Sequence, residues 1–530
     1  MSIGAMDAAE DDKYLFDCFI DTGDLSLLTD TKDSKCIVLG RTGSGKSALL
    51  EVIKNSEENT ISLLPQELSL NYITNSTIIR FFENLGIKLD LFYQLLWRHV
   101  LVVELIKKKY NIANEESEKT FFERIRSIFD KDKNKEEAID YFIEWGDKFW
   151  LETDKRIKEL TTKLENELSA TADMSGIGLP LSGTASDNLS REKIEEVIHR
   201  AQKVVNSVQI QKLNKVISLL AEDIFIDQQQ KYFILIDKLD DEWVDDELRH
   251  RLIRALIETI KTFKKIIPVK IIVSLRTDLL SRVFEHTRDS GFQEEKYDDL
   301  ILRLKWTRTE LHELLDKRIS QLIKSQYTSA GADFNGIFTG KPNREKPIDY
   351  ILDRTLMRPR DAISFVNICL DRAYGEAEIN TAIIKSAEKQ YSKKRFNALC
   401  HEWYGTYPYL DRYTNIIKNK KTPFKHSDIS DKDIDDLALN LSIIENPYPD
   451  PIRVIALKLF EKDSSSRAAI RINILRVLYR VGIVGVKKAS YQSVSWSQED
   501  EPLISESEIK NSTHFEIHPM LHSYLGANSH

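Results

Sequence analysis

The sequence predicts an α/β fold in which a parallel sheet carries a long helical insertion and is followed by a helical lid and a small C-terminal domain. Three observations predict it. Apolar, strand-like runs at Cys36–Leu39, Tyr232–Ile236 and Val269–Leu275 are each followed by a helical pattern, as in parallel sheets. Between the first and second runs, helical periodicity dominates over residues 75–225. Near the C-terminus a helical segment precedes short strand-like runs.

The composition is that of a folded protein from a reducing environment. Hydrophobic residues make up 42% of the 530 residues, enough for a sizeable core, so extensive disorder is excluded. Lys and Arg number 76 against 84 Asp and Glu, a net charge of −8, so nucleic-acid binding would need a local basic patch. The four cysteines are too few for a disulfide framework and lack zinc-site spacing, which favours a cytoplasmic location.

No segment has the pattern of a targeting or membrane-spanning sequence. Residues 1–12 are small and acidic and lack the basic and apolar regions of a signal peptide. The longest apolar candidate, Leu91–Ile106, is interrupted by Arg98 and Glu104, so it predicts a buried helix. We therefore expect no contact with a membrane.

A glycine-rich loop follows the first strand-like run and precedes a helical pattern over residues 48–53. This strand, loop and helix order is the context of a Walker A motif, in which backbone N–H groups wrap phosphates without interference from Cβ atoms. Lys46 is expected to reach the β- and γ-phosphates of ATP, and the Ser47 hydroxyl to bind Mg²⁺. The predicted nucleotide-binding residues of this loop are Gly40, Arg41, Thr42, Gly43, Ser44, Gly45, Lys46 and Ser47. The fold is therefore predicted to be that of a P-loop NTPase.

The second strand-like run ends at Asp237, which is the pattern of a Walker B carboxylate that holds Mg²⁺. Many ATPases place a catalytic glutamate next, but that position is Lys238, which cannot act as a base while protonated. Either Asp240 or Asp241 is then expected to polarise the attacking water. The alternative is a solvated acidic turn.

Two arginine-bearing sites are candidates for sensing the nucleotide. Arg276 ends the third strand-like run, where it could read the charge of the γ-phosphate, although an arginine at a strand end is often only solvated. Arg358-Pro359-Arg360-Asp361 opens a helix, with proline in its first turn. Arg358 and Arg360 could reach the nucleotide from the lid, or form an ion-pair cluster with Asp361.

The insertion contains two amphipathic helical segments that predict a long hairpin over residues 150–220. Its tip, Thr171–Ser190, is rich in Gly, Ser and Thr and predicts either a loop or a two-stranded finger. The hairpin could dock an effector protein. The predicted domains are an ATPase core at 1–60 and 226–300, the helical insertion at 61–225, a helical lid at 301–400 and a winged-helix-like domain at 401–530.

The order of these motifs resembles that of bacterial P-loop ATPases of the STAND and KAP type, which are related to the AAA+ ATPases. The run from Asp237 to Asp241 is similar to the NACHT and KAP variant, in which a second acid follows three or four places after the first. The C-terminal segment Leu475–Leu525 is similar to the winged helix that ends many such chains. The insertion is longer than in the family, and no repeat domain follows. The resemblance implies a nucleotide-driven switch, often found in phage defence or DNA maintenance.

Besides a scaffold whose hairpin docks an effector protein, two functions remain possible on the sequence alone. The first is an ATP-binding and hydrolysing switch that forms a homo-oligomer or acts on an effector protein. The second is a nucleic-acid-binding protein whose winged helix reads DNA under the control of ATP. A C-terminal helix carries Arg467, Arg471, Arg476 and Arg480, but acids and bases are about balanced over residues 401–530. We therefore expect weak DNA binding.

Overall fold

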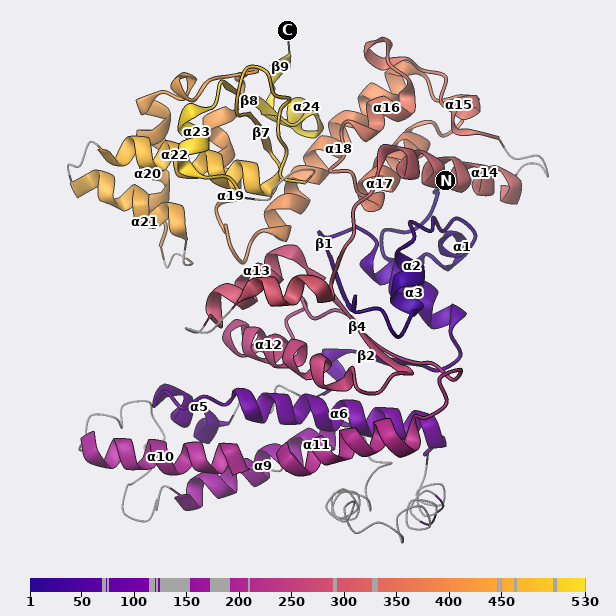
Figure 1. Ribbon diagram of the computed structural model, residues 1–530. Helices are drawn as coiled ribbons and strands as arrows, with labels where there is room; N and C mark the ends of the chain where they lie inside the picture. The colour runs from indigo at the N-terminus through magenta and orange to yellow at the C-terminus, as the bar shows by residue number, and fades with distance from the viewer. Residues whose placement is uncertain are drawn as a thin grey trace. The chain divides into compact units, whose positions relative to one another are not determined.

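The computed structural model describes most of the chain as two compact units (Figure 1). The described residues are 1–68, 76–113, 153–171, 191–207, 210–288, 293–326, 332–445, 450–461, 465–498 and 503–529, with the single positions Ile73, Thr120, Glu123 and Tyr448. Unit 1 contains residues 1–20, 42–45 and 305–530. Unit 2 contains residues 21–41 and 46–304.

Unit 2 is built on a five-stranded sheet with the order β2-β3-β4-β1-β5. All neighbouring strands run parallel. The residues of β1, β3 and β4 are almost wholly buried, as expected for a sheet with both faces covered. The strands are β1 (Ile37–Gly40), β2 (Thr60–Leu63), β3 (Tyr232–Ile236), β4 (Val269–Arg276) and β5 (Ile301–Arg303). The predicted parallel sheet is confirmed.

Helices cover this sheet, with α12 and α13 on one side of the strands and α2 and α3 on the other (Figure 1). Their bounds are α2 (Asp24–Thr29), α3 (Lys46–Ser56), α12 (Asp246–Phe263) and α13 (Thr277–His286). Helix α12 begins where Asp245 caps it, because the Asp245 carboxylate accepts a hydrogen bond from the Leu248 N–H. Its apolar face, including Leu252 and Leu256, is fully buried.

The insertion forms a layer of helices that packs on α12. Its helices are α5 (Thr77–Asn84), α6 (Asp90–Tyr110), α9 (Thr153–Thr171), α10 (Arg191–Ser207), α11 (Ile210–Leu219) and the π-helical turn η5 (Leu220–Ile224). Helix α6 is buried on nearly all sides and the Trp97 indole N–H donates to the Leu252 carbonyl of α12. Helices α9 and α10 pack together, as the hairpin prediction requires. The predicted tip from residue 172 to 190 lies outside the described residues.

Unit 1 begins with a group of helices formed by residues 305–402. They are α14 (Arg308–Gln326), α15 (Phe334–Ile337), η7 (Pro342–Arg344), α16 (Pro347–Leu352), α17 (Pro359–Arg372) and α18 (Thr381–Glu402). The N-terminal segment with η1 (Ala8–Glu10) and α1 (Asp12–Leu15) packs here, because the buried Arg318 guanidinium pairs with Asp11 at 2.6 Å. Residues 1–20 therefore belong to unit 1. From the sequence they were expected, with the rest of residues 1–60, to belong to the ATPase core that contains the parallel sheet.

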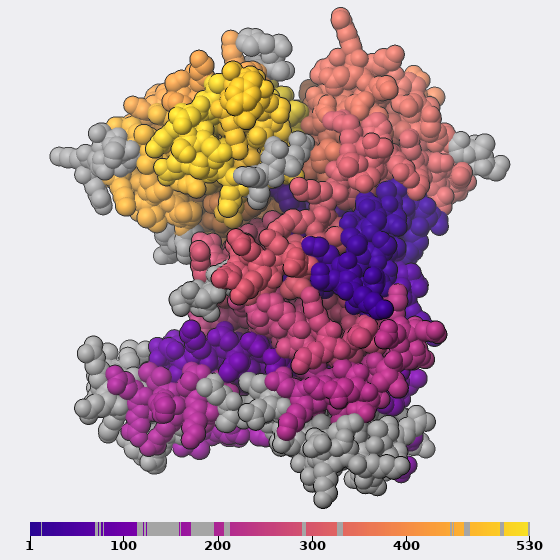
Figure 2. All heavy atoms as spheres, in the orientation of Figure 1, coloured from indigo at the N-terminus to yellow at the C-terminus, as the bar shows by residue number. Residues whose placement is uncertain are grey.

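The remainder of unit 1 combines short helices with a β-hairpin. Its elements are α19 (Leu410–Tyr413), η8 (Thr414–Ile417), β6 (Lys421–Thr422), η9 (His426–Asp428), α20 (Asp431–Ser442), α21 (Pro451–Leu457), η10 (Lys458–Glu461), α22 (Ser465–Val481), β7 (Val484–Lys487), α23 (Glu506–Asn511), β8 (His514–Ile517), η11 (Pro519–Leu521), α24 (His522–Leu525) and β9 (Asn528–Ser529). Strands β7 and β8 pair antiparallel, and Val486 also bridges to Ser495. The space-filling view shows this orange and yellow part as one continuous mass (Figure 2). Over the described ranges of both units, no helix is long and apolar enough to cross a membrane.

Candidate functional site

The carboxyl ends of β1, β3 and β4 bring together residues that lie far apart in the sequence. Gly40, the last residue of β1, is the direct neighbour of Arg276 at the end of β4. Ile236, the last residue of β3, is the neighbour of Val273, so Asp237 emerges beside β4 as well. Ligands of parallel sheets bind at this edge. The structure thus places the predicted residues of three strands at one edge of the sheet.

Asp237 is held by the strand next to it. Its carboxylate accepts a hydrogen bond from the Ser274 hydroxyl of β4. The next residue, Lys238, has a positive φ of 58°, which is costly for a side chain other than glycine. This strained position turns the chain sharply, so that Asp240 and Asp241 follow within one turn.

Asp240 and Asp241 face opposite sides of β3. The Asp240 carboxylate lies 3.8 Å from the Arg276 guanidinium of β4, the strand that neighbours β1. The Asp241 carboxylate accepts a 2.7 Å hydrogen bond from the side chain of Gln66, which follows β2 on the far side. Burial, followed by the charge of Asp240, raises the pKa of Asp241. Asp240 is therefore the acid directed toward the strand that carries the glycine loop.

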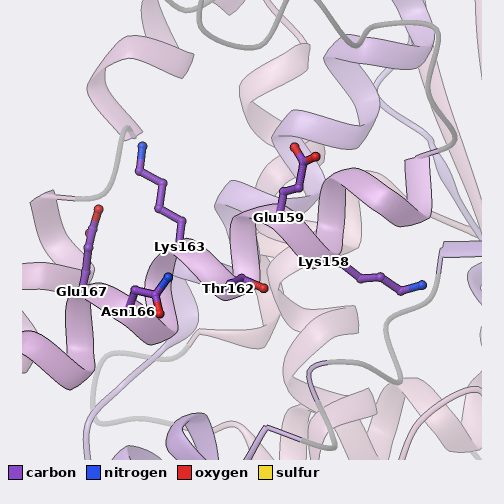
Figure 3. A pocket seen from close by; sticks show the side chains of 6 residues that line it. All are labelled: Lys158, Glu159, Thr162, Lys163, Asn166 and Glu167. Carbon is purple, nitrogen blue, oxygen red and sulfur yellow. The ribbon is translucent and has the colours of Figure 1, made fainter.

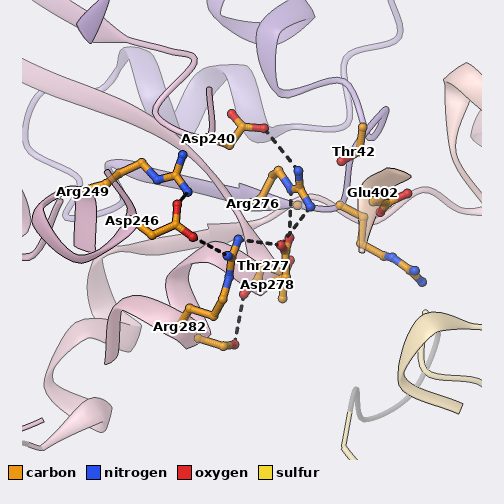
Figure 4. Close-up of polar contacts among 12 residues, drawn as sticks. Thr42, Asp240, Asp246, Arg249, Arg276, Thr277, Asp278, Arg282 and Glu402 are labelled. Atoms are coloured by element: carbon orange, nitrogen blue, oxygen red, sulfur yellow. Dashed lines mark hydrogen bonds and ion pairs between the residues drawn. The ribbon is translucent and has the colours of Figure 1, made fainter. Parts of the chain in front are cut away.

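Arg276 forms the centre of a charged cluster (Figure 4). Its guanidinium donates two hydrogen bonds to Asp278, at 2.9 and 2.8 Å, in addition to the ion pair with Asp240. Arg282 also bonds Asp278, at 3.4 Å, and lies 4.0 Å from Asp246. Only 16% of the Arg276 side chain is exposed. The cluster orients Arg276 at the sheet edge.

The two ends of the glycine loop belong to unit 2. The buried Lys46 ammonium donates to the carbonyls of Gly40 and Arg41, both at 3.2 Å. Helix α3 begins at Lys46, so Ser47 lies in its first turn. The N-terminus of a helix favours anions because its N–H groups are unpaired and its dipole is positive there.

The tip of the loop, Thr42–Gly45, belongs to unit 1, where donors hold three consecutive carbonyls. The Arg358 guanidinium donates to the Thr42 carbonyl at 2.7 Å. The Arg360 backbone N–H donates to the Gly43 carbonyl at 3.3 Å, and the Trp306 indole N–H to the Ser44 carbonyl at 2.8 Å. We call Trp306, Arg358 and Arg360 the carbonyl clamp.

The carbonyl clamp determines the direction of the loop's N–H groups. In a planar trans peptide the C=O of one residue and the N–H of the next point in opposite directions. The N–H groups of Gly43, Ser44 and Gly45 therefore point away from the clamp. The hydroxyls of Thr42 and Ser44 are buried without a hydrogen-bond partner in the described structure. Such groups fit a polar, anionic ligand.

Two features of the structure require a glycine at position 43: its backbone conformation and the close approach of Arg360. Its φ is +79°, and a Cβ atom there would lie 2.6 Å from the Arg360 Cβ. A side chain would push the loop away from Arg360. The sequence prediction attributed the glycines to phosphate contact, whereas here the close approach is made by a protein side chain.

Arg358 is locked in a buried ion-pair cluster. It pairs with Asp361 at 3.0 Å and with Glu402 at 3.2 Å, and Arg395 pairs with the same two acids. The charges of Arg358 and Arg395 lower the pKa of Asp361 to about 2 despite its burial. The pKa of Arg358 is raised by Asp361 and Glu402 although burial alone would lower it. The ion-pair alternative considered for this motif is therefore present, and Arg358 binds the loop in addition.

Arg360 is placed differently from Arg358. Its Nε atom donates to the Met6 carbonyl at 3.2 Å and its side chain lies against Gly43. Burial, together with the charge of Arg358, lowers its pKa. Both lid arginines thus touch the outside of the loop.

The described residues contain no group of three or more His, Cys, Asp or Glu side chains that could hold a metal ion by itself. Proteins commonly hold Mg²⁺ by one or two ligands, with phosphate oxygens and water completing the shell. Ser47 and Asp237 are suitable ligands for such a shell.

Several residues of the site have no signal in the sequence. Gln66 and Trp306 act through hydrogen bonds to partners far away in the chain, whereas Ser274, which bonds Asp237, stands near the end of the third strand-like run, two residues before Arg276. The sequence contains a weak indication of Asp278, because an acid two residues after Arg276 at a strand end is close enough to pair with it. The others become visible only when the strand order and the lid are known.

Two comparisons with known proteins bear on this chain. A model of the FunZ-associated C-terminal helical domain matches residues 309–400, which span α14 to α18. The chain is also similar to the "Putative transposon gamma-delta 80.3 kDa protein" of Escherichia coli (strain K12), with 23% identity over 506 residues. That alignment covers 93% of this chain and 62% of the relative, so the chain spans less than two thirds of the relative's length.

Proposed function

We propose that the protein is an ATP-binding and hydrolysing switch. The observation that carries this proposal is the carbonyl clamp, which turns the N–H groups of Gly43, Ser44 and Gly45 away from Trp306, Arg358 and Arg360. Converging N–H groups after a strand and before a helix bind phosphate. The sequence of the loop, from Gly40 to Ser47, matches the Walker A pattern.

The nucleotide would be bound as its Mg²⁺ complex. Lys46 would exchange its bonds to loop carbonyls for the β- and γ-phosphates. Ser47 and Asp237 would hold Mg²⁺, which neutralises phosphate charge, and Ser274 would keep Asp237 oriented.

Asp240 is the proposed water-orienting group. It lies on the β4 side of β3, toward the strand that carries the loop, whereas Asp241 is bonded to Gln66 on the β2 side. Arg276 pairs with Asp240 and would stabilise charge that develops on the γ-phosphate. The raised pKa of Asp241 would suit a general base. However, the Asp241 side chain is directed toward Gln66 and not toward the strand that carries the glycine loop.

The lid would report the state of the nucleotide through the carbonyl clamp. A ligand can shift a conformational equilibrium only by binding one state more tightly than the other. The clamp would supply such a difference in affinity for the nucleotide, because it orients the N–H groups of the loop only in the state in which the lid helices hold the loop carbonyls. This fits the resemblance to STAND and KAP ATPases, in which such a switch would drive oligomer formation or act on an effector protein in the cytoplasm.

DNA binding is the second candidate function, and the similarity to a protein named for a transposon favours it. The order of α20, α21, α22 and the β7–β8 hairpin is compatible with a winged helix. However, the α22 arginines are engaged within the protein. Arg467 pairs with Asp435 at 2.7 Å and Arg471 with Asp431 at 2.7 Å. We therefore propose weak DNA binding that moderate salt abolishes.

The proposal is tested by ATP binding and turnover in three variants. Lys46→Ala should weaken ATP binding about tenfold or more in calorimetry, because the charge opposite the phosphates is lost. Asp240→Asn should bind ATP normally and hydrolyse it about a hundredfold more slowly, and Asp241→Asn serves as the matched control with a smaller loss. Unchanged ATP affinity in Lys46→Ala would refute the assignment of the loop, and equal effects of the two aspartates would refute the role of Asp240.

A further inference from the structure

A cavity of unit 2 is lined by basic residues of three helices. It has a volume of about 470 Å³ and lies among α6, α11 and α12. Its lining residues are Arg98, Asn214, Lys215, Ile217, Ser218, Lys261, Thr262 and Lys265. Four of these side chains are basic and none is acidic. A volume of this size suits a small ligand.

Arg98 is the unusual member of this set. The residue is 7% exposed, in the middle of the apolar helix α6. Among the described residues, its guanidinium bonds to two amide oxygens, those of Asn214 at 2.8 Å and of Gln94 at 3.3 Å. Its Nε atom is buried with no partner. A buried charge is costly unless an opposite charge compensates it, and no carboxylate of the described residues forms an ion pair with Arg98.

One of the lining lysines already has an acidic partner. Lys261 pairs with Glu258 at 3.2 Å and lies 3.8 Å above the Tyr297 ring, so Glu258 is directed to Lys261. Burial is the only cause that shifts the Arg98 pKa, and it lowers it. An arginine stays protonated nonetheless.

Other cavities of unit 2 mix the two signs. The hollow on α9 is lined by Lys158, Glu159, Thr162, Lys163, Asn166 and Glu167 (Figure 3). A third cavity has two glutamates and three lysines in its lining, namely Glu57, Glu58, Lys108, Lys109 and Lys231. Of these three cavities, the Arg98 cavity is the one whose lining carries basic side chains and no acidic side chain.

We propose that the Arg98 cavity binds a small phosphate-bearing ligand, separately from the glycine loop. Arg98 would form charge-assisted hydrogen bonds from its Nε and guanidinium to phosphate oxygens. The lysines would add charge at the mouth, and the Ser218 and Thr262 hydroxyls further hydrogen bonds. A ligand there would compensate the buried charge of the insertion helices.

The test uses the full chain in a Lys46→Ala background, so that phosphate groups at the glycine loop do not contribute. Inorganic pyrophosphate is titrated by calorimetry at constant ionic strength. We expect one site, whose affinity falls at least tenfold in Lys215→Ala/Lys265→Ala. Lys264→Ala is the matched control, because Lys264 is an exposed lysine of the same region that does not line the cavity.

A second measurement addresses Arg98 itself. Arg98→Met keeps the side-chain length and removes the charge, so its melting temperature without ligand should equal or exceed that of the parent. Pyrophosphate should raise the melting temperature of the parent and leave that of the variant unchanged. If Arg98→Met fails to fold, the lysine variants still decide the question. Absence of pyrophosphate binding in the Lys46→Ala background, or equal losses in the Lys264→Ala control, would overturn the proposal.

Discussion

The clusters around Arg358 and Arg276 contain the same chemical groups in different surroundings. In the first cluster, the side chains of Arg358, Asp361 and Glu402 are 3%, 1% and 6% exposed. In the second, Arg276 is 16% and Asp240 30% exposed. A buried network cannot exchange partners without leaving a charge unpaired, whereas a partly exposed one can replace a lost partner with water. We infer that the Arg358 cluster positions the loop and that the Arg276 cluster can respond to a ligand.

The largest expected effect comes from breaking the buried cluster. Asp361→Asn removes one of the two carboxylates that face Arg358 and Arg395, leaving buried positive charge in excess. We expect the free energy of unfolding to fall by about 3–5 kcal/mol, measured by chemical denaturation. Asp278→Asn is the control in the partly exposed cluster, and its loss should be below about 2 kcal/mol. If the two variants lost equal free energy of unfolding, the proposed difference between a buried and a partly exposed cluster would be wrong.

The clusters should also differ in their response to acid. His250 lies among Arg282, His286, Asp246 and Arg249, and burial followed by the nearby arginine lowers its pKa to about 4. A neutral buried histidine stabilises the fold fully above its ordinary pKa of about 6.5, and this contribution is lost as the pH falls through about 4. Asp361, with its pKa lowered to about 2, keeps its charge over that range.

We therefore expect the wild type to lose on the order of 2 kcal/mol of stability more than His250→Asn between pH 6.5 and pH 4. Chemical denaturation of both proteins across this range measures the difference. Parallel pH profiles of the wild type and the variant would contradict the prediction.

The smallest expected effect is functional. Arg276→Gln should reduce ATP turnover about tenfold, roughly 1.4 kcal/mol, and change the unfolding free energy by less, because water can reach Asp240, whose side chain is 30% exposed. Arg282→Gln is the control, since Arg282 shares Asp278 but does not stand beside Gly40. Steady-state kinetics with both variants decides whether Arg276 has the role that Arg282 lacks.

Local patterns were sufficient to predict the sheet and several residues of its edge. Each of the three strand-like runs became a strand of the parallel sheet, and Asp237 and Arg276 stand at strand ends as predicted. The buried helix predicted around Leu91–Ile106 is α6. These predictions depend on periodicity and on residues adjacent in the chain, which a sequence displays directly.

The structure was needed for every feature that depends on distant partners. The order of the strands separates Asp240 from Asp241, although they are neighbours in the sequence. The N-terminal segment joins unit 1 through Asp11 and Arg318, which no local pattern indicated.

The sequence by itself determined the strand, loop and helix around Lys46, the acid after the second strand and the helical character of the insertion. Hydrophobic periodicity and glycine spacing specify these locally. Only the tertiary structure decided what each charged side chain does. Arg358 holds a loop carbonyl within buried ion pairs, whereas the buried Arg98 bonds to amide oxygens in the part of the chain that the structure describes. The role of a charge depends on its burial and on the groups it meets, and folding brings those groups from distant parts of the chain.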